Sequence, residues 1–363
     1  MVEKAYLNAL NQFYFIGPKR MEQALERFSH AEEIWHASEK QLKSLPLWVE
    51  VAEEFVVNRK NIDVSEEWNK VKEAGVEVIT KDSSRYPELL KQIYDAPYIL
   101  YAKGEIKPEE VCISIVGSRK CTSYGQEIAY ELGRELAARG VTVVSGMALG
   151  IDSFAHKGAL QKGRTIAILG SGADVVYPRK NQGLYTSIKN QGVVVSEFPL
   201  GTEPVSYNFP RRNRIISGMC LGTVVVEAPE KSGALITADY ALEQGREVFA
   251  VPGSVRSPYS KGCHKLIKEG ARMVEGIDDV LEEIKFITGS TEEKLQLGGD
   301  TGTAVELSED EEGVLAVLPY DALHIDSIIE KSGFSASRVG SILLNLELKG
   351  WVKQLPGKYF LRS

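Results

Sequence analysis

VCISIVGSRK (residues 111–120), VTVVSGMALG (141–150) and TIAILGSGAD (165–174) are the stretches of sequence that decide the fold. Each runs from an apolar, β-branched segment into a glycine-rich loop, and helical patterns separate the three. Continuous apolar strands that alternate with helices are typical of a parallel sheet covered on both faces. With right-handed crossovers, this pattern predicts a doubly wound, mostly parallel α/β sheet of the Rossmann-like kind.

The rest of the chain divides around this sheet. Residues 1–65 show short amphipathic helical patterns and predict a small helical domain of the SAM or helix-hairpin-helix kind. Residues 66–110 add strand-like runs, which extend the Rossmann-like domain to 66–285. Residues 286–307 are rich in Gly and Thr with few apolar positions and predict a flexible linker. Residues 308–363 combine a capped helix, two further helices and a strand pair, the pattern of a winged-helix domain.

The turn Phe15-Ile16-Gly17-Pro18-Lys19 lies between the first two expected helices. A Gly-Pro turn before a helix with an early lysine is half of a helix-hairpin-helix signature, whose loop amides bind phosphate. The full signature has two glycines, and Phe15 occupies the place of the first. Two interpretations stay open: the turn grips DNA, or it only packs the helices together.

Charge and cysteine usage narrow the class of protein. The net charge is −7, but residues 111–285 carry 21 Lys and Arg against 18 Asp and Glu, so a polyanion would meet the middle of the chain. The four cysteines are far apart and form no CxxC pair, which argues against a disulfide framework and a zinc site. No stretch approaches the roughly 20 apolar residues that span a bilayer. We expect a cytoplasmic protein without a metal or cofactor and without membrane contact.

The glycine-rich loops are candidate anion-binding sites. Glycine lets backbone amides approach an anion closely, and a helix N-terminus adds a partial positive charge. One such loop is weak evidence, because a tight strand-to-helix turn also uses glycine, but three at one sheet edge predict an anion track. The loop residues that we expect to contact DNA are Gly117, Ser118, Arg119, Gly146, Gly170 and Gly172, and the later helix start adds Ser232 and Gly233.

Two segments combine basic and aromatic side chains, which is what sequence-tolerant binding of a single strand requires. FPRRNR (209–214) comes after the fourth apolar run, residues 193–196, and YPRK (177–180) follows the third glycine loop. Two other interpretations stay open. The segment 209–214 could be a solvated helix start, or Arg212 or Arg214 could be buried in an ion pair with Glu227 or Glu197. The expected DNA-contacting residues are Tyr177, Arg179, Lys180, Phe209, Arg211, Arg212, Asn213 and Arg214.

Several common chemistries are poorly supported. The chain has no GxxxxGK[ST] phosphate-binding loop, and Gly170-Ser171-Gly172 lacks the third glycine of the dinucleotide fingerprint. His156 lies at helical spacing from apolar residues with no nucleophile beside it, so we interpret it as structural. We therefore assign no catalytic residue and do not expect an enzyme.

The ordered set of motifs resembles the DprA/Smf family of DNA-processing proteins. The motifs that carry the resemblance are GSR (117–119), SGMALGID (145–152), AH (155–156), YP (177–178), FPRRNR (209–214), SGALITA (232–238) and VPG (251–253). The resemblance implies an extended Rossmann fold that binds single-stranded DNA, self-associates as a homodimer or larger assembly, and loads the RecA recombinase in natural transformation and recombination. It implies that Arg119, Lys180 and segment 209–214 line the DNA groove. From the residues themselves we expect Phe209 or Tyr177 to stack on a base.

Two alternatives concern other parts of the sequence. The Rossmann variant also resembles phosphoribohydrolases of the lysine-decarboxylase-like family, whose PGGxGTxxE glutamate does the chemistry. Here the corresponding stretch, residues 231–239, lacks the second glycine pair and ends in Asp239. The winged helix suggests duplex binding, but its expected recognition helix offers only Arg338 and Lys349, so a protein-contact or autoregulatory role is favoured.

Overall fold

The protein forms two compact units, residues 1–298 and 299–363, in the computed structural model. The structure describes residues 2–288, 308–319, 323–349, 351–355 and 357–362. The expected linker 286–307 therefore lies almost entirely outside the described residues, although helix α14 (Ile277–Thr288) runs into its beginning. Each unit is described by itself below.

The first unit is built on one mixed, mostly parallel sheet, as the sequence predicts. Strands β3 to β9 pair in parallel, while β1 and β2 form an antiparallel extension that joins the sheet at β6. The spatial order is β1 (Glu77–Thr80), β2 (Ile99–Gly104), β6 (Val193–Ser196), β5 (Thr165–Ile168), β4 (Thr142–Ser145), β3 (Cys112–Val116), β7 (Gly222–Val225), β8 (Glu247–Ala250) and β9 (Arg272–Met273). The order reverses between β3 and β7, and ligands of doubly wound sheets bind at such a switch point.

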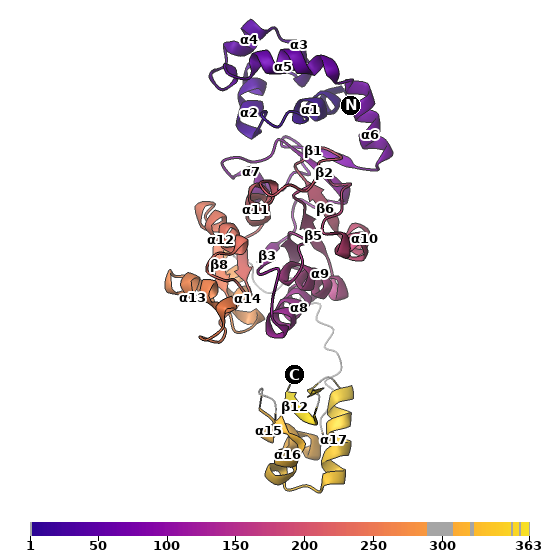
Figure 1. Ribbon diagram of the computed structural model, residues 1–363, viewed down its shortest axis with the longest axis vertical. Coiled ribbons are helices and arrows are strands. Elements are labelled where there is room, and N and C mark those ends of the chain that lie inside the picture. Colours follow the sequence, from indigo (N-terminus) through magenta and orange to yellow (C-terminus); the bar gives the residue numbers. More distant parts are fainter. Residues whose placement is uncertain (1, 289–307, 320–322, 350, 356, 363) are drawn as a thin grey trace. The chain divides into compact units, whose positions relative to one another are not determined.

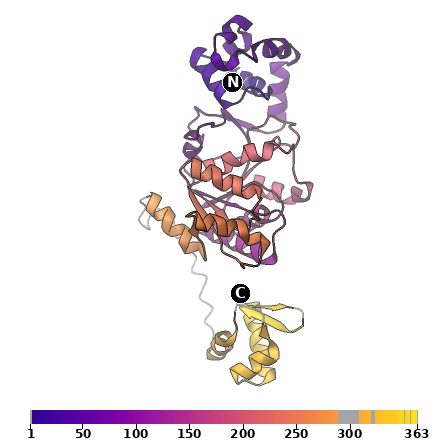
Figure 2. The same ribbon diagram turned by 60° about the vertical axis from the view of Figure 1, so that its left-hand side comes forward.

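Helices cover both faces of this sheet, which explains why its central strands are apolar throughout. One face packs against α8 (Ser123–Ala138), α9 (Ile151–Lys162), α10 (Gln182–Gln191) and α14. The other face packs against α7 (Glu88–Lys91), α11 (Asn208–Gly218), α12 (Gly233–Glu243) and α13 (Lys261–Lys268). Figure 1 shows α8 and α9 on the opposite side of the strands from α11 and α12, and in Figure 2 the red and orange helices of residues 208–268 lie in front of the strands.

Helix α11 begins earlier than the sequence pattern predicts. The apolar periodicity indicates a helix from Asn213, whereas α11 starts at Asn208. Pro210 is tolerated there because the first helical turn needs no intrahelical N–H donors. The basic and aromatic segment 209–214 is therefore helical, and neighbouring side chains point to different faces.

The N-terminal helices form an aromatic core of their own, which includes Phe13, Trp35, Trp48 and Phe55. The elements are α1 (Val2–Asn11), α2 (Pro18–Arg27), α3 (Ala31–His36), α4 (Glu39–Lys43), α5 (Ala52–Asn58) and α6 (Val64–Glu73). Helix α6 packs against α1, so the expected domain boundary after residue 65 falls inside a helix of this module. The same core continues into β1 and β2, and the division into domains stays a prediction.

The second unit is a winged helix. It contains α15 (Glu309–Val317), α16 (Ile325–Ser332) and α17 (Ala336–Leu348), with a sheet in the order β10 (Leu323–His324), β12 (Tyr359–Arg362), β11 (Val352–Leu355). Ser308 and Glu311 form the capping box that starts α15. Its small core gathers apolar residues from all three helices and from β11 and β12.

Two negative findings apply to the part of the chain that the structure describes. Within it, no helix has the length and apolarity needed to cross a bilayer. The same residues contain no cluster of three or more His, Cys, Asp or Glu side chains arranged to hold a metal ion.

Candidate nucleic-acid interface

A cavity of about 580 Å³ opens at the switch point of the sheet. Its walls are the loops that follow β3 and β7, together with the first turns of α11 and α12. Among the residues expected to contact DNA, those that line this groove are Gly117, Ser118, Arg119, Tyr177, Phe209, Arg212, Asn213, Ser232 and Gly233. Residues from four separate segments of sequence thus converge on one site.

An aromatic pair with a cation beside it forms one wall of the groove. The ring centroids of Tyr177 and Phe209 are 5.6 Å apart with an interplanar angle of 33°. The guanidinium of Arg119 lies over the Phe209 ring, 5.1 Å from its centroid. Tyr177 is 41% exposed and Arg119 is exposed, so both are accessible to a ligand. Aromatic faces beside an arginine can stack a base and bind its phosphate.

Arg212 plays a structural part beneath this wall. Its side chain is buried, and its Nη1 donates to the carbonyl oxygen of Gly146 at 2.9 Å and to that of Ile168. These carbonyls follow β4 and end β5, so one guanidinium ties two strand ends to α11. Burial lowers the pKa of Arg212 to about 10, which leaves it charged at neutral pH. It lines the floor of the groove, but much of its hydrogen-bonding capacity is used by the protein.

Arg214 lies away from the groove. It is 2% exposed, with Nη2 2.5 Å from Glu197 Oε2 and Nε 2.9 Å from Asp95 Oδ2. The expectation that Arg214 contacts DNA is therefore wrong for this conformation, and the ion-pair alternative with Glu197 describes it. The physical reason is the helical period, which turns this side chain towards the interior.

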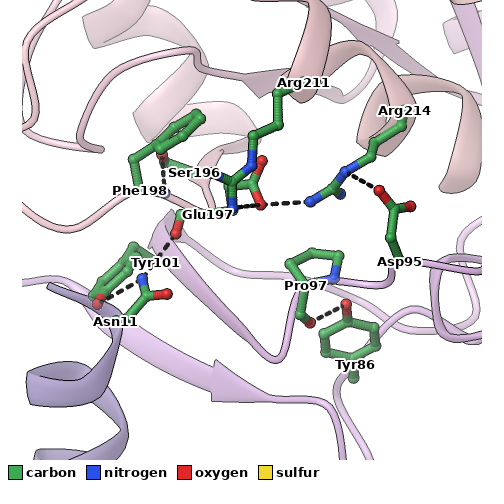
Figure 3. A network of polar contacts seen from close by, with 10 residues as sticks. All are labelled: Asn11, Tyr86, Asp95, Pro97, Tyr101, Ser196, Glu197, Phe198, Arg211 and Arg214. Atoms are coloured by element: carbon green, nitrogen blue, oxygen red, sulfur yellow. Dashed lines mark hydrogen bonds and ion pairs between the residues drawn. The ribbon is translucent and has the colours of Figure 1, made fainter. Parts of the chain in front are cut away.

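Arg211 is the accessible arginine of the segment. Its side chain is 37% exposed and its Nη2 is 3.5 Å from Glu197 Oε2 (Figure 3). The guanidinium also lies over the Phe198 ring, 5.4 Å from the centroid. Because Arg214 already neutralises Glu197 at close range, Arg211 is held only loosely.

Two of the loop glycines, Gly146 and Gly170, make room for side chains of α11, a packing role that the expected anion track did not include. A Cβ atom at Gly146 would lie 2.6 Å from the Arg212 guanidinium, and one at Gly170 would lie 2.8 Å from the Phe209 ring. The Gly146 amide donates to Asp152 Oδ2 at 3.1 Å, and the Gly172 amide donates to the Thr202 carbonyl at 2.9 Å. The amides of Gly146 and Gly172 are therefore already bonded and do not await a phosphate.

The first loop positions Arg119. The Ser118 amide donates to the Glu227 carbonyl at 2.6 Å, and Ser118 Oγ accepts from the Lys120 amide at 3.1 Å. Gly117 is needed for close packing, since a Cβ there would meet Ile151 at 2.6 Å. Gly117 and Ser118 thus shape the loop while the Arg119 side chain points into the site.

The start of α12 is open to the groove. Ser232 caps the helix by accepting from the Ala234 amide at 3.3 Å. Gly233 is exposed, and a Cβ added there would meet nothing within 4 Å. Asn213 Nδ2 donates to the Gly233 carbonyl at 3.3 Å, which links α11 to this turn. Asn213 itself is 9% exposed, so its role is to join the two walls.

Arg179 and Lys180 are exposed but lie outside the residues that line the groove. They belong to the short 3-10 turn Arg179–Asn181 that follows Tyr177 and Pro178. Asn181 holds this turn by donating to the Met147 carbonyl at 2.8 Å and to Ser153 Oγ at 2.9 Å. The turn therefore positions Tyr177, and its two cations stand nearby.

Sequence reasoning missed two contributors to the groove. Lys231 is exposed and lines the cavity, and Ile236, which is 37% exposed, adds an apolar patch from the first turns of α12. The signal for Lys231 was its place directly before Ser232-Gly233 in a strand-end loop. Ile236 had no such signal, because an apolar residue in a helix is usually buried.

Neither His156 nor Asp239 has the geometry of a catalytic residue. His156 is fully buried, its Nδ1 lies 2.6 Å from Thr165 Oγ1, and burial lowers its pKa to about 3. This agrees with the structural interpretation. Asp239 is exposed on α12 and is not among the residues that line the groove.

Known proteins resemble this chain over most of its length. The family model described as DNA recombination-mediator protein A matches residues 77–285, and the model of the DprA winged helix domain matches residues 300–358. Protein Smf of Escherichia coli is 41% identical over 308 residues, which is 83% of this chain and 81% of that protein. Protein Smf of Synechocystis is 33% identical over 99% of both chains.

Two solved structures match the fold. DNA processing protein A of Streptococcus pneumoniae superposes with a TM-score of 0.60 at 41% identity, over 64% of this chain and 82% of that one. The Helicobacter pylori protein, described for its single-stranded DNA binding mode, superposes with a TM-score of 0.54 at 27% identity, over 59% of this chain and 98% of that one. From its motifs, its fold and these matches, the chain belongs to the DprA/Smf family of DNA-processing proteins.

Proposed function

We propose that this DNA-processing protein binds single-stranded DNA in the groove at the switch point, largely without sequence preference. The convergence of Arg119, Tyr177 and Phe209 on one accessible wall carries the proposal. A base stacks against the aromatic pair, because every base offers a π-face and stacking tolerates any sequence. The H. pylori protein, whose structure is described for its single-stranded DNA binding mode, supports the binding of a single strand.

Phosphates are held by cations around the groove rather than by its deep loops. Arg119 and Lys231 are exposed and line the cavity, and Arg179 and Lys180 stand outside its rim. The open first turn of α12 at Ser232-Gly233 adds a positive helix end. Affinity then falls steeply as salt rises. The logarithm of the binding constant decreases with the logarithm of the salt concentration, with a slope of about −0.7 for each phosphate contacted on a single strand.

The experiment is fluorescence anisotropy of a labelled oligo-dT strand across a salt series, with duplex of equal length as competitor. The Arg119→Ala and Phe209→Ala variants remove the cation and the stacking ring, and we expect each to lower affinity by about tenfold or more. Lys40→Ala, which removes an exposed lysine of α4, is the control and keeps wild-type affinity. Absence of binding by wild type at low salt contradicts the proposal.

We extend the proposal to recombination on the basis of family membership. The protein acts in the cytoplasm without membrane contact, self-associates as a homodimer or larger assembly on DNA, and loads RecA recombinase during natural transformation. Two copies on one strand raise the overall affinity, because the second binds at a high local concentration. The rate of ATP hydrolysis by RecA on single strands to which this protein is bound measures the loading. We expect the wild-type protein to raise this rate and the Arg119→Ala variant to leave it unchanged.

Binding is better supported than hydrolysis. The carboxylate that lines the groove, Asp152, is buried and accepts hydrogen bonds from the amides of Gly146 and Ala148. Asp239 lies on the exposed surface of α12. A phosphoribohydrolase needs a carboxylate free to act at the sugar. Incubation with nucleoside monophosphates tests this directly, and release of ribose phosphate would favour the enzyme instead.

The winged helix is proposed to contact protein rather than duplex DNA. In the first turn of its helix α17, Arg338 pairs with Asp310 at 2.5 Å, and Lys349 at the C-terminal end of this helix pairs with Glu311 at 2.7 Å. Duplex affinity depends on free cations that neutralise phosphates, and these two are already paired. The duplex competitor above tests this as well.

A further inference from the structure

A second hollow lies where the N-terminal helices meet α11. Gly17 and Pro18, the turn that resembles half of a hairpin motif, line it together with Tyr98, Glu197 and Arg211. Arg211 comes from the same first turns of α11 that supply Phe209 and Arg212 to the groove. The N-terminal turn and the groove therefore meet on two sides of one short helical segment.

Hydrogen bonds fix the helical module at this place. Asn11 Nδ2, at the end of α1, donates to the Glu197 carbonyl at 3.0 Å (Figure 3). The Tyr101 hydroxyl donates to Asn8 Oδ1 at 2.7 Å. Asn8 and Tyr101 are both fully buried. These bonds join α1 to the middle of β2 and to the residue after β6, and the turn after α1 lines the same hollow as Arg211 of α11.

Lys19, which directly follows Pro18, is partly exposed and lies beside an exposed aromatic ring. Lys19 Nζ lies 4.2 Å from the centroid of the Tyr94 ring, and Tyr94 is 82% exposed. Glu22 is shared by Lys19 at 3.0 Å and Lys81 at 2.9 Å, so it neutralises only one of the two lysines.

The α11 side holds two arginines and two carboxylates. Glu197 lies between Arg214 and Arg211, and Asp95 further neutralises Arg214. Arg211 is the more exposed of the two arginines and the more distant from the carboxylate. A phosphate can therefore take Arg211 from Glu197 while Arg214 keeps that buried carboxylate neutralised.

We propose that Arg211, Lys19 and Tyr94 form a second DNA contact, called here the hairpin-side surface, for the strand that leaves the groove. The proposal rests on the proposed binding of single-stranded DNA in the groove. Arg211 and Lys19 bind phosphates, and a base stacks on the open face of Tyr94. The combination of cations with an exposed ring fits a single strand, because a single strand offers both phosphates and unpaired bases.

Binding of DNA strands of two lengths distinguishes the groove from the hairpin-side surface. We would measure anisotropy of oligo-dT of about 6 and about 20 nucleotides with the full-length protein, since one binding fold covers about 4–16 nucleotides. We expect Tyr94→Ala and Lys19→Ala to weaken binding of the long strand by about tenfold and roughly threefold, and to leave the short strand unchanged. Tyr94→Phe and Lys19→Arg keep the ring and the charge, and they should keep wild-type affinity for both strands.

Each outcome has one meaning. If the short strand binds wild type and the Tyr94→Ala and Lys19→Ala variants bind the long strand as wild type does, the hairpin-side surface is refuted and the groove stands. If neither strand binds wild type, the proposed function fails first. Lys40→Ala removes an exposed lysine from α4, at the end of the module away from the sheet (Figure 1), and controls for net charge.

Discussion

Gly146→Ala tests whether Gly146 makes room for Arg212 of α11 or offers its backbone amide to a phosphate. The added Cβ would lie 2.6 Å from both Nη1 and Nη2 of Arg212. Ordinary contacts are about 3.5 Å, so the guanidinium has to move by about 1 Å. That movement breaks the 2.9 Å hydrogen bond from Arg212 to the Gly146 carbonyl and disturbs the bond to Ile168.

The expected loss follows from the charge on the donor. A hydrogen bond from a charged group contributes about 1.5–3 kcal/mol, and overpacking adds a further penalty of about 1–3 kcal/mol. We therefore expect the free energy of unfolding to fall by about 3 kcal/mol. For a unit of this size the midpoint of thermal unfolding then falls by roughly 6–12 °C.

The assay is thermal unfolding followed by circular dichroism, with DNA anisotropy on the same samples. Gly183→Ala is the matched control, because Gly183 lies in α10 with nothing within 4 Å of a Cβ and alanine favours a helix. It should melt at or above the wild-type temperature. An unchanged midpoint for Gly146→Ala together with weaker DNA binding would refute this reasoning. It would instead support the expectation that the Gly146 amide binds a phosphate.

Buried groups around the groove give three further predictions. Glu197→Gln removes the carboxylate that two arginines of α11 share, and we expect urea unfolding to show a loss of about 3–5 kcal/mol. Burial lowers the pKa of His156 to about 3, against 6.5 for an ordinary histidine, so the unfolded chain binds one more proton between these pH values. Stability from this group is therefore complete above pH 6.5 and falls by about 1.4 kcal/mol per unit as pH drops towards 3, a slope that His156→Gln should remove. Gly170→Ala places a Cβ 2.8 Å from the Phe209 ring, and we expect anisotropy to show weaker oligo-dT binding with a nearly unchanged melting temperature.

Specific results would contradict each of these. A Glu197→Gln protein as stable as wild type would mean that the arginines find other partners. An equal pH dependence in wild type and His156→Gln would assign the slope to other groups. Wild-type DNA affinity in Gly170→Ala would show that the Phe209 ring can shift without losing its contact with a base.

Much of the fold was predictable because its signals are local. The strand-to-helix alternation over 111–285 follows from apolar runs and helical spacing, which depend only on neighbouring residues. The two edge strands and the winged helix were visible for the same reason, but the antiparallel direction of the edge strands was not. The start of α11 was not, because Pro210 and three polar residues hide five helical positions from any apolar periodicity.

The site was predictable by segment but not by side chain. Arg119, Tyr177 and Phe209 meet in the groove as expected, since loops at the carboxyl ends of parallel strands share one sheet edge. Lys231 and Ile236 join them only because α12 begins at that edge.

The sequence by itself determined the architecture of this protein, its family and the segments that form the groove. Only the tertiary structure decided what each arginine of 209–214 does. Helical geometry sends Arg212 to the strand ends and Arg214 to Glu197, and it leaves Arg211 accessible. The partners that neutralise these charges lie elsewhere in the chain, and burial of a charge depends on such partners rather than on its neighbours in sequence.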